Sequence, residues 1–257
     1  MLKHGELDGA PGIFVVIAAF KLSPEWQMLE RRAQRVKIEQ AAQLVRRNAR
    51  RAEIDIYISR GLNAHCDYFL RVRARKLQDA QRIVQSFCAS ALGRLSVTAD
   101  TLVGVTKLRR YINQEHSPEL TTSLNAATYQ DAEPQFAIVI PVKKSARWWN
   151  LPEADRLKEI ETHTRKALPY LDRVKRELYH STGLDDLDFI TYFETADLQA
   201  FQELCTELMA IPENEYHTRW GQPVLLGAIQ PVGEAFSPLV RKQQSEKVML
   251  HKETRKL

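Results

Sequence analysis

Apolar residues recur along this chain with two different periods, and each period predicts a different element. Residues 13–20 form an apolar run that is too short to span a bilayer and predicts a first β-strand. The alternating, aromatic-rich segments 67–73 and 188–193 predict two further strands. A stripe with helical spacing is made by Leu157, Ile160, Thr164, Leu168 and Leu171. The chain is therefore predicted to mix strands with amphipathic helices.

The chain also repeats itself at an offset of 122 residues, the distance from Phe14 to Phe136. The matched blocks are residues 14–26 with 136–148, 57–62 with 179–184 and, one residue later, 102–104 with 225–227. Three matched blocks in one order indicate an internal duplication. Each copy is predicted to run strand–helix–strand–strand–helix–strand, which is the ferredoxin-like unit. The predicted fold class is α+β, with two ferredoxin-like repeats whose sheets join.

The duplication also sets the expected domain boundaries. We expect a first repeat over residues 1–125, a second over 126–240 and a basic tail over 241–257. The stretch 113–133 is rich in Ser, Thr, Asn and Gln and is expected to link the two copies.

Composition excludes several classes of function. A hydrophobic content of 44% and a mean hydropathy of −0.37 describe a globular chain without membrane insertion. The net charge of +5 favours anionic partners, and much of the excess lies in the arginine-rich segment 46–51 and in the tail. A solvated helix face explains such a cluster more often than a binding site does. The basic segments carry no interleaved aromatic residues, so nucleic-acid binding is not expected.

Cysteine usage and the first residues bear on the compartment. Cys66, Cys88 and Cys205 lie far apart and form no Cys-x-x-Cys unit. This argues against a zinc ribbon, an attached c-type haem or a disulfide framework and predicts ordinary buried thiols. Glu6 and Asp8 precede the first apolar run and fit a secretory leader poorly. A cytoplasmic location is expected for the chain as written, and a periplasmic one if a leader was removed.

The two copies differ where reactive side chains stand, and His163 is the first such position. It lies at the edge of the apolar stripe, and its counterpart in the first copy is Ala41. A lone histidine on an apolar face is more often a core residue than a ligand. The counterpart shows that the scaffold does not require a histidine there, so His163 is a candidate ligand.

Arg176 is the second position at which the copies differ. It shares one strand face with Leu178, and its counterpart in the first copy is Ile54. An inward Arg176 would be a charge in an apolar pocket, which is costly unless the charge is paired or awaits an anion. An outward Arg176 would form a surface salt bridge. The residues alone leave both interpretations open.

Glu213 follows the last helix of the second copy and stands close to His217. A carboxylate that accepts the far ring proton of a ligating histidine fixes its tautomer and strengthens it as a donor. From the residues alone, Glu213 is more readily explained as a solvated cap. His180 and His217 are explained in the same way, as surface or turn histidines.

These candidates stand in strings that resemble the chlorite dismutase family. The strings are Ile140-Pro-Val-Lys-Lys144, Trp148-Trp-Asn-Leu-Pro152, Glu161-Thr-His-Thr164, Val174-Lys-Arg-Glu-Leu-Tyr-His-Ser-Thr-Gly-Leu-Asp-Asp186, Asp188-Phe-Ile-Thr-Tyr-Phe-Glu-Thr195 and Glu213-Asn-Glu-Tyr-His-Thr-Arg-Trp-Gly221. They run in the family's order across nearly the whole second half, and the first half resembles the family more loosely.

The resemblance implies that the two ferredoxin-like repeats form a dimeric α+β barrel. It also implies one haem b (iron protoporphyrin IX) per subunit, bound in the second repeat. His163 would ligate the iron, Glu213 would be its hydrogen-bonded partner and Arg176 would be the distal catalytic arginine. The other implied contacts are Leu178, Thr191 and Phe193 in the distal pocket, Trp148, Trp149 and Trp220 around the haem, and Lys144 and Tyr111 at its propionates.

The implied activity is the conversion of chlorite into chloride and dioxygen, through an oxo-ferryl haem and a hypochlorite held by Arg176. In the same superfamily, coproheme decarboxylases carry tyrosines where this chain has Ile140 and Trp149, so the dismutase is favoured. A non-catalytic haem-binding barrel is the remaining alternative. The chain resembles the pentameric branch of the family, and a homo-oligomer, in particular a pentamer, is expected.

Overall fold

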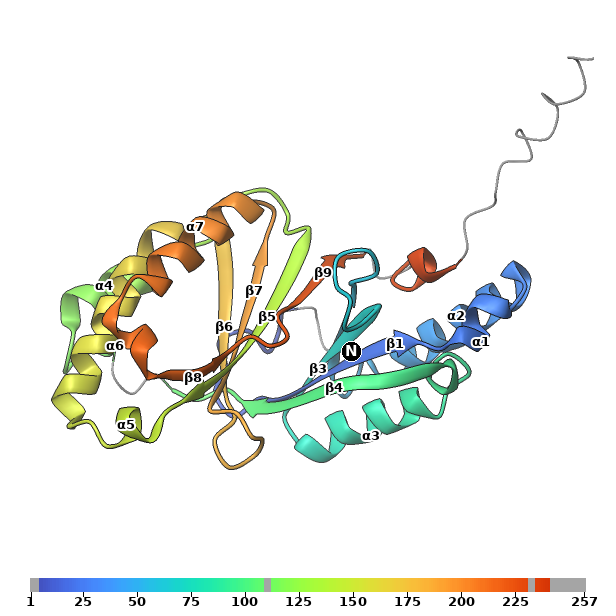
Figure 1. Cartoon of the computed structure of the whole chain (residues 1–257), viewed down its shortest axis with the longest axis horizontal. Coiled ribbons are helices and arrows are strands. Elements are labelled where there is room, and N and C mark those ends of the chain that lie inside the picture. The colour runs from blue at the N-terminus through green and yellow to red at the C-terminus, as the bar shows by residue number, and fades with distance from the viewer. Residues whose placement is uncertain (1–4, 109–111, 231–233, 241–257) are drawn as a thin grey trace, which may run out of the picture.

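Two β-α-β-β-α-β repeats lie side by side in the computed structural model, which describes residues 5–108, 112–230 and 234–240 (Figure 1). The first repeat comprises β1 (Phe14–Leu22), α1 (Pro24–Met28), α2 (Arg31–Asn48), β2 (Glu53–Ile58), β3 (Tyr68–Ala74), α3 (Leu77–Cys88) and β4 (Ser96–Val105). The second comprises β5 (Phe136–Lys144), α5 (Ala146–Trp149), α6 (Glu153–Ala167), β6 (Val174–His180), β7 (Phe189–Thr195), α7 (Leu198–Met209), β8 (His217–Trp220) and β9 (Leu225–Ile229). Tyr111 and the tail 241–257 lie outside the described residues.

A helix links the repeats where the sequence indicated a polar linker. This helix, α4 (Pro118–Ala126), packs through Leu120 and Leu124 in one cluster with Ile160 of α6. The linker is therefore anchored to the second repeat. Among the described residues, no helix has both the length and the apolarity that crossing a bilayer requires.

The two repeats share individual contacts as well as the order of their elements. The backbone N–H of Leu22 donates to Asp67 Oδ2 at 2.8 Å. In the second repeat, the backbone N–H of Lys144 donates to Asp188 Oδ2, also at 2.8 Å. Each carboxylate thus ties the end of its repeat's first strand to the residue before its third strand. The predicted duplication and the α+β class are confirmed.

The described part of the chain forms a nine-stranded sheet in the order β7-β6-β4-β1-β3-β2-β9-β5-β8. β5 also pairs with β7, which closes an α+β barrel. The repeats meet at two seams, β4 with β6 and β2 with β9. Within the described residues, the first seam has one pair, Val105 with His180, and the second joins residues 57–58 to 228–229. Because so few backbone pairs cross the seams, interior side chains must contribute much of the attachment between the repeats.

Alternate residues of each strand point to opposite sides of the sheet. One set fills the barrel and includes Val15, Ile17, Tyr57, Phe69, Val139, Tyr179, Ile190 and Tyr192. The other set faces the helices, around Ala41 in the first repeat and around Ile138, Ile140 and Ala167 in the second. The helix-facing side of the second repeat is the side on which the candidate residues gather.

The last strand of the second repeat is split into β8 and β9. Gly221 lies between them with φ +73°, in the left-handed region that favours glycine. β9 pairs with the first half of β5, and β8 pairs with its end, placing Trp220 opposite Val142. Trp220 thereby joins the helix-facing cluster of the second repeat.

The three cysteines are free thiols, but the prediction that they are buried holds for only one of them. Cys66 is buried, and Cys88 and Cys205 are half-buried. Burial raises the pKa of Cys66 and raises that of Cys205 to about 11. Both thiols are therefore protonated at neutral pH and poorly reactive.

Candidate functional site

His163 lies on the sheet-facing side of α6. It precedes Ala167 by one helical turn, and Ala167 is buried in the same cluster as Ile138 and Phe193 of the sheet. Nδ1 of His163 lies 2.6 Å from Oε2 of Glu213. Because this hydrogen bond engages Nδ1, Nε2 is the nitrogen from which His163 can ligate a metal.

Glu213 is buried in a 3₁₀ helix, Pro212–Tyr216, and binds two partners. Besides His163, it accepts a hydrogen bond from Lys144 Nζ at 2.5 Å. Burial raises the pKa of Glu213, but the hydrogen bonds and charges of His163 and Lys144 outweigh burial and lower this pKa to about 2. The carboxylate is therefore ionised at neutral pH, and the interpretation of Glu213 as a solvated cap is wrong.

Lys144 is buried at the end of β5 and contacts residues that the sequence did not connect with it. Its Nζ lies 4.3 Å from the ring centroid of Trp148, which in turn packs 5.5 Å from the ring of Tyr216. Burial lowers the pKa of Lys144, while Glu213 favours its charged form. The resemblance placed Lys144 at a haem propionate. The structure directs its ammonium group to Glu213, so Lys144 stands beside the His163–Glu213 pair, and the propionate contact stays a prediction.

The sheet opposite α6 brings the predicted pocket residues onto one wall. Arg176 pairs with Phe193, and Leu178 pairs with Thr191. Directly opposed residues share a face of the sheet, and Phe193 belongs to the helix-facing cluster. Arg176 therefore stands on the helix-facing side, which settles on which side of the sheet it lies. Leu178 is 46% exposed on this wall, an unusual fraction for a large apolar residue in a sheet.

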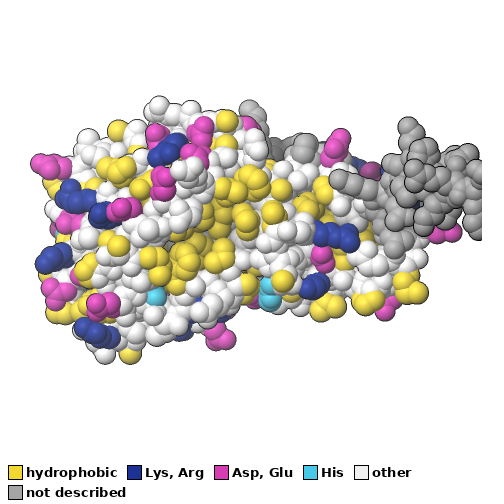
Figure 2. Space-filling view, turned by 45° about the horizontal axis from the view of Figure 1, so that its top comes forward, with side chains coloured by type: hydrophobic (Ala, Val, Ile, Leu, Met, Phe, Trp, Pro, Cys, Tyr) yellow, Lys and Arg dark blue, Asp and Glu magenta, His cyan; other side chains and the backbone are white. Residues whose placement is uncertain are grey.

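Aromatic side chains border the same wall. Trp149 of α5 is 43% exposed and stacks on Phe189 at 6.3 Å between ring centroids. Phe189 meets the ring of His180 edge-on at 5.4 Å. Sequence reasoning did not assign Phe189 to the site, although its strand alternation with Thr191 and Phe193 was a usable signal. Figure 2 shows hydrophobic side chains gathered in a hollow on the left half of the molecule, where Figure 1 places the second repeat.

The fold and site define a class of protein: a barrel of two ferredoxin-like repeats with a histidine–carboxylate pair facing an apolar, arginine-bearing wall in the second repeat. The family model described as chlorite dismutase matches residues 34–230. This chain belongs to the chlorite dismutase family.

Individual relatives agree with this assignment. The chain is 46% identical to a chlorite dismutase of Ideonella dechloratans over 90% of this chain and 81% of that protein. A structure of the chlorite dismutase from Candidatus Nitrospira defluvii with imidazole matches with a TM-score of 0.88 and 35% identity, covering 93% and 99% of the two chains. A coproheme decarboxylase of Mycolicibacterium smegmatis is 25% identical over 67% of this chain and 71% of that protein.

Proposed function

We propose that this chain is a haem-dependent chlorite dismutase that converts chlorite into chloride and dioxygen. Membership of the family implies haem, and we propose one haem b per subunit, held between α6 and the sheet of the second repeat. The observation that carries the proposal is the 2.6 Å hydrogen bond between His163 Nδ1 and Glu213, on the side of α6 that faces the wall bearing Arg176.

His163 would hold the iron through Nε2. Glu213 accepts the Nδ1 proton, which fixes the tautomer and gives the ring anionic character. Lys144 holds the other oxygen of Glu213 and keeps the carboxylate ionised. The haem, when bound, supplies the redox chemistry needed to break a chlorine–oxygen bond and form an oxygen–oxygen bond.

The aromatic and apolar residues of the wall suit a flat, largely apolar ligand. Leu178 and Trp149 present exposed apolar surface, and the cluster behind them includes the buried Phe193 of β7 and the half-buried Trp220 of β8. Thr191 is held in place by a 3.0 Å hydrogen bond from its hydroxyl to the carbonyl of Ile140. These contacts fit a macrocycle whose proximal side meets His163.

Arg176 would hold the anionic substrate and retain the hypochlorite fragment. Its guanidinium is permanently charged and offers several donors. Two unit charges about 4 Å apart attract by about 4 kcal/mol at an effective dielectric constant near 20. An attraction of this size retains an anion for recombination and still lets chloride leave.

Ile140 argues against the decarboxylase alternative. It is buried on the helix-facing side of β5, where the resemblance puts the catalytic tyrosine of coproheme decarboxylases. An aliphatic side chain cannot carry an oxidising equivalent. The identity to the decarboxylase, 25%, is also well below the 46% to the dismutase.

An oxygen electrode tests the proposal. Chlorite added to the haem-loaded protein should release one dioxygen and one chloride per chlorite consumed. Absence of oxygen would refute dismutation, and carbon dioxide release from added coproheme would identify a decarboxylase instead. Haem quantification tests the proposed one haem per subunit. Light scattering tests the proposed pentamer, which should have five times the subunit mass of 29.6 kDa.

A further inference from the structure

β6, the strand that carries Arg176, has little backbone attachment to the first repeat. Along one edge it pairs with β7 over its whole length. Along the other edge, the described residues of β4 pair with it only at His180. Close packing reinforces that end, because a Cβ on Gly104 would lie 2.8 Å from the Cβ of Tyr179. The segment around Arg176 must therefore be held by other contacts.

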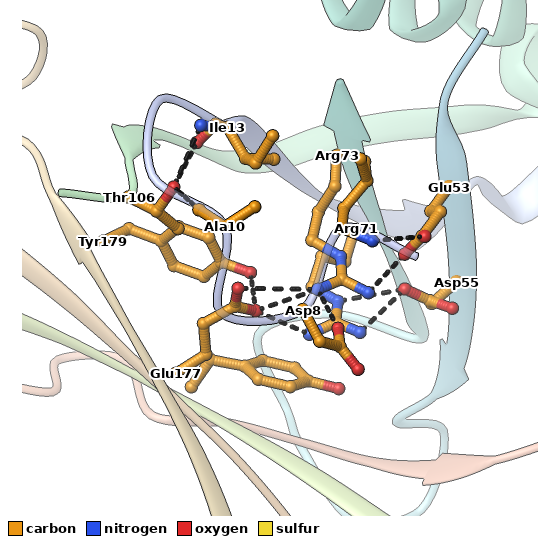
Figure 3. Close-up of polar contacts among 12 residues, drawn as sticks. Asp8, Ala10, Ile13, Glu53, Asp55, Arg71, Arg73, Thr106, Glu177 and Tyr179 are labelled. Carbon is orange, nitrogen blue, oxygen red and sulfur yellow. Dashed lines mark hydrogen bonds and ion pairs between the residues drawn. The ribbon is translucent and has the colours of Figure 1, made fainter. Parts of the chain in front are cut away.

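Side chains inside the barrel supply these contacts (Figure 3). Glu177 accepts hydrogen bonds from Arg71 Nη1 at 3.4 Å and from Arg73 Nη1 at 3.2 Å, and both arginines belong to β3 of the first repeat. The hydroxyl of Tyr179 donates to the same carboxylate. Glu177 thus ties β6 to the first repeat one residue away from Arg176.

The two arginines are themselves firmly placed. Arg71 and Arg73 are 3% and 1% exposed. Arg71 pairs with Asp55 at 2.9 Å and lies 3.8 Å from the ring centroid of Tyr192. Arg73 pairs with Glu53 and, at 2.5 Å, with Asp8. A buried charge with several partners keeps one geometry, because moving away from any partner would leave a buried charge unpaired.

We propose that Arg71 and Arg73 are positioning residues for Arg176. Successive strand residues alternate, so Glu177 points into the barrel while Arg176 and Leu178 point to the haem side. Holding Glu177 therefore fixes the height and tilt of Arg176 over the opposite face. The inference rests on the proposed function, and it gives the first repeat a part in the chemistry of the second.

Glu194 provides a matched control for Glu177. Its side chain is 16% exposed against 15% for Glu177. It also pairs with Arg71, at 3.5 Å, and accepts a hydrogen bond from a tyrosine, Tyr192. Glu194, however, lies on β7, which is paired along its length with both β5 and β6. Losing its charge should leave the wall in place.

The experiment compares Glu177→Gln and Glu177→Ala with Glu194→Gln in the haem-loaded protein. Two haem ligands report on the site by their Soret shifts. Nitrite is an anion that the charge of Arg176 should stabilise, and imidazole in its neutral form makes no such demand. We expect Glu177→Ala to lower the affinity for nitrite by about tenfold or more, and Glu177→Gln to lower it by less. A displacement of the Arg176 side chain by about 1 Å is enough for such a loss. Imidazole affinity and haem content should stay within about twofold in all three variants. KM for chlorite should rise in the Glu177 variants only.

Unchanged nitrite affinity in both Glu177 variants would overturn the proposal. Equal losses in the Glu177 and Glu194 variants would also overturn it, because they would show a general loss of barrel stability. The ligand titrations do not depend on turnover. If the wild-type protein evolves no oxygen, the proposed function is refuted. If the Glu177 variants, but not the Glu194 variant, nevertheless bind nitrite more weakly than the wild type, the positioning role still stands.

Discussion

Replacing Lys144 by methionine tests the buried group that supports His163. Methionine keeps an unbranched apolar stem against Trp148 and removes the ammonium that binds Glu213 at 2.5 Å. Removing one partner of a buried ion pair costs about 3–5 kcal/mol when the other charge is left alone. Glu213 keeps its hydrogen bond to His163, so we expect a loss nearer the value of one charged hydrogen bond, about 2–3 kcal/mol. For a chain of this size, that lowers Tm by about 5–10 °C.

The measurement is urea and thermal unfolding of the haem-loaded protein, followed by far-ultraviolet circular dichroism. Lys143→Met is the matched control, because Lys143 is the adjacent residue on β5 and points to the opposite side of the sheet. The control should change the free energy of unfolding by about 0.5 kcal/mol or less. Equal stability of Lys144→Met and wild type would refute the reasoning, since it would mean that the ammonium contributes nothing net to a buried carboxylate.

Three further changes test the site. His163→Ala should abolish tight haem binding, and an unchanged Soret band would contradict its role as iron ligand. Arg176→Ala should keep the haem but lower kcat/KM for chlorite by about 10²–10³-fold in oxygen-electrode assays, and full, durable oxygen evolution would be incompatible with its role. Burial, with Lys107, lowers the pKa of His180, so the unfolded chain takes up a proton that the folded chain does not and stability should fall as pH drops below about 6.5. His180→Gln should lessen that loss in unfolding measured between about pH 7 and pH 5, and an identical pH slope would count against it.

The sequence predicted the fold well because each weak pattern of apolar residues occurs twice, at the same spacing, in the duplicated chain. One apolar run starting at Phe14 is ambiguous, but a second at Phe136 with the same downstream spacing indicates a shared unit. The observed bounds keep that offset: α2 begins at Arg31 and α6 at Glu153. The linker helix α4 was not predicted, because its apolar positions Leu120 and Leu124 are too few to mark a helix in a polar stretch.

The sequence supplied candidate site residues, but it gave no signal for the contacts between them. Strand alternation placed Arg176 beside Leu178, and the register of β6 with β7 confirms that arrangement. The bond from Lys144 to Glu213 joins residues 69 positions apart and had no local signal. The resemblance named Lys144 as a haem contact, and that contact stays a prediction. The bond to Glu213 was not anticipated, since a family string fixes position in sequence and not the direction of a flexible side chain.

The barrel interior was the main omission. Phe69, Arg71 and Arg73 are spaced two residues apart on β3. A strand prediction therefore puts two charges on the same face as a core aromatic residue. Such a pattern indicates buried charges with partners. The partners could not be named, because Glu177 lies in the other repeat and becomes a neighbour only when the barrel closes.

The helix-facing side of the sheet is filled differently in the two repeats, which explains why that side suits a cofactor in the second repeat and not in the first. On the helix-facing side of the first repeat, the chain packs its own C-terminal segment. Phe236 stacks on Phe87 at 5.8 Å, and the carbonyl of Leu239 accepts a hydrogen bond from the indole of Trp26. Ala41, the counterpart of His163, is fully buried in that core, where an imidazole would not fit. In the second repeat the equivalent position carries a histidine that is 35% exposed, facing a wall with Leu178 and Trp149 still open. The face that is filled in the first repeat is thus less filled in the second, and the buried arginines of the first repeat pair with Glu177, next to Arg176 on β6.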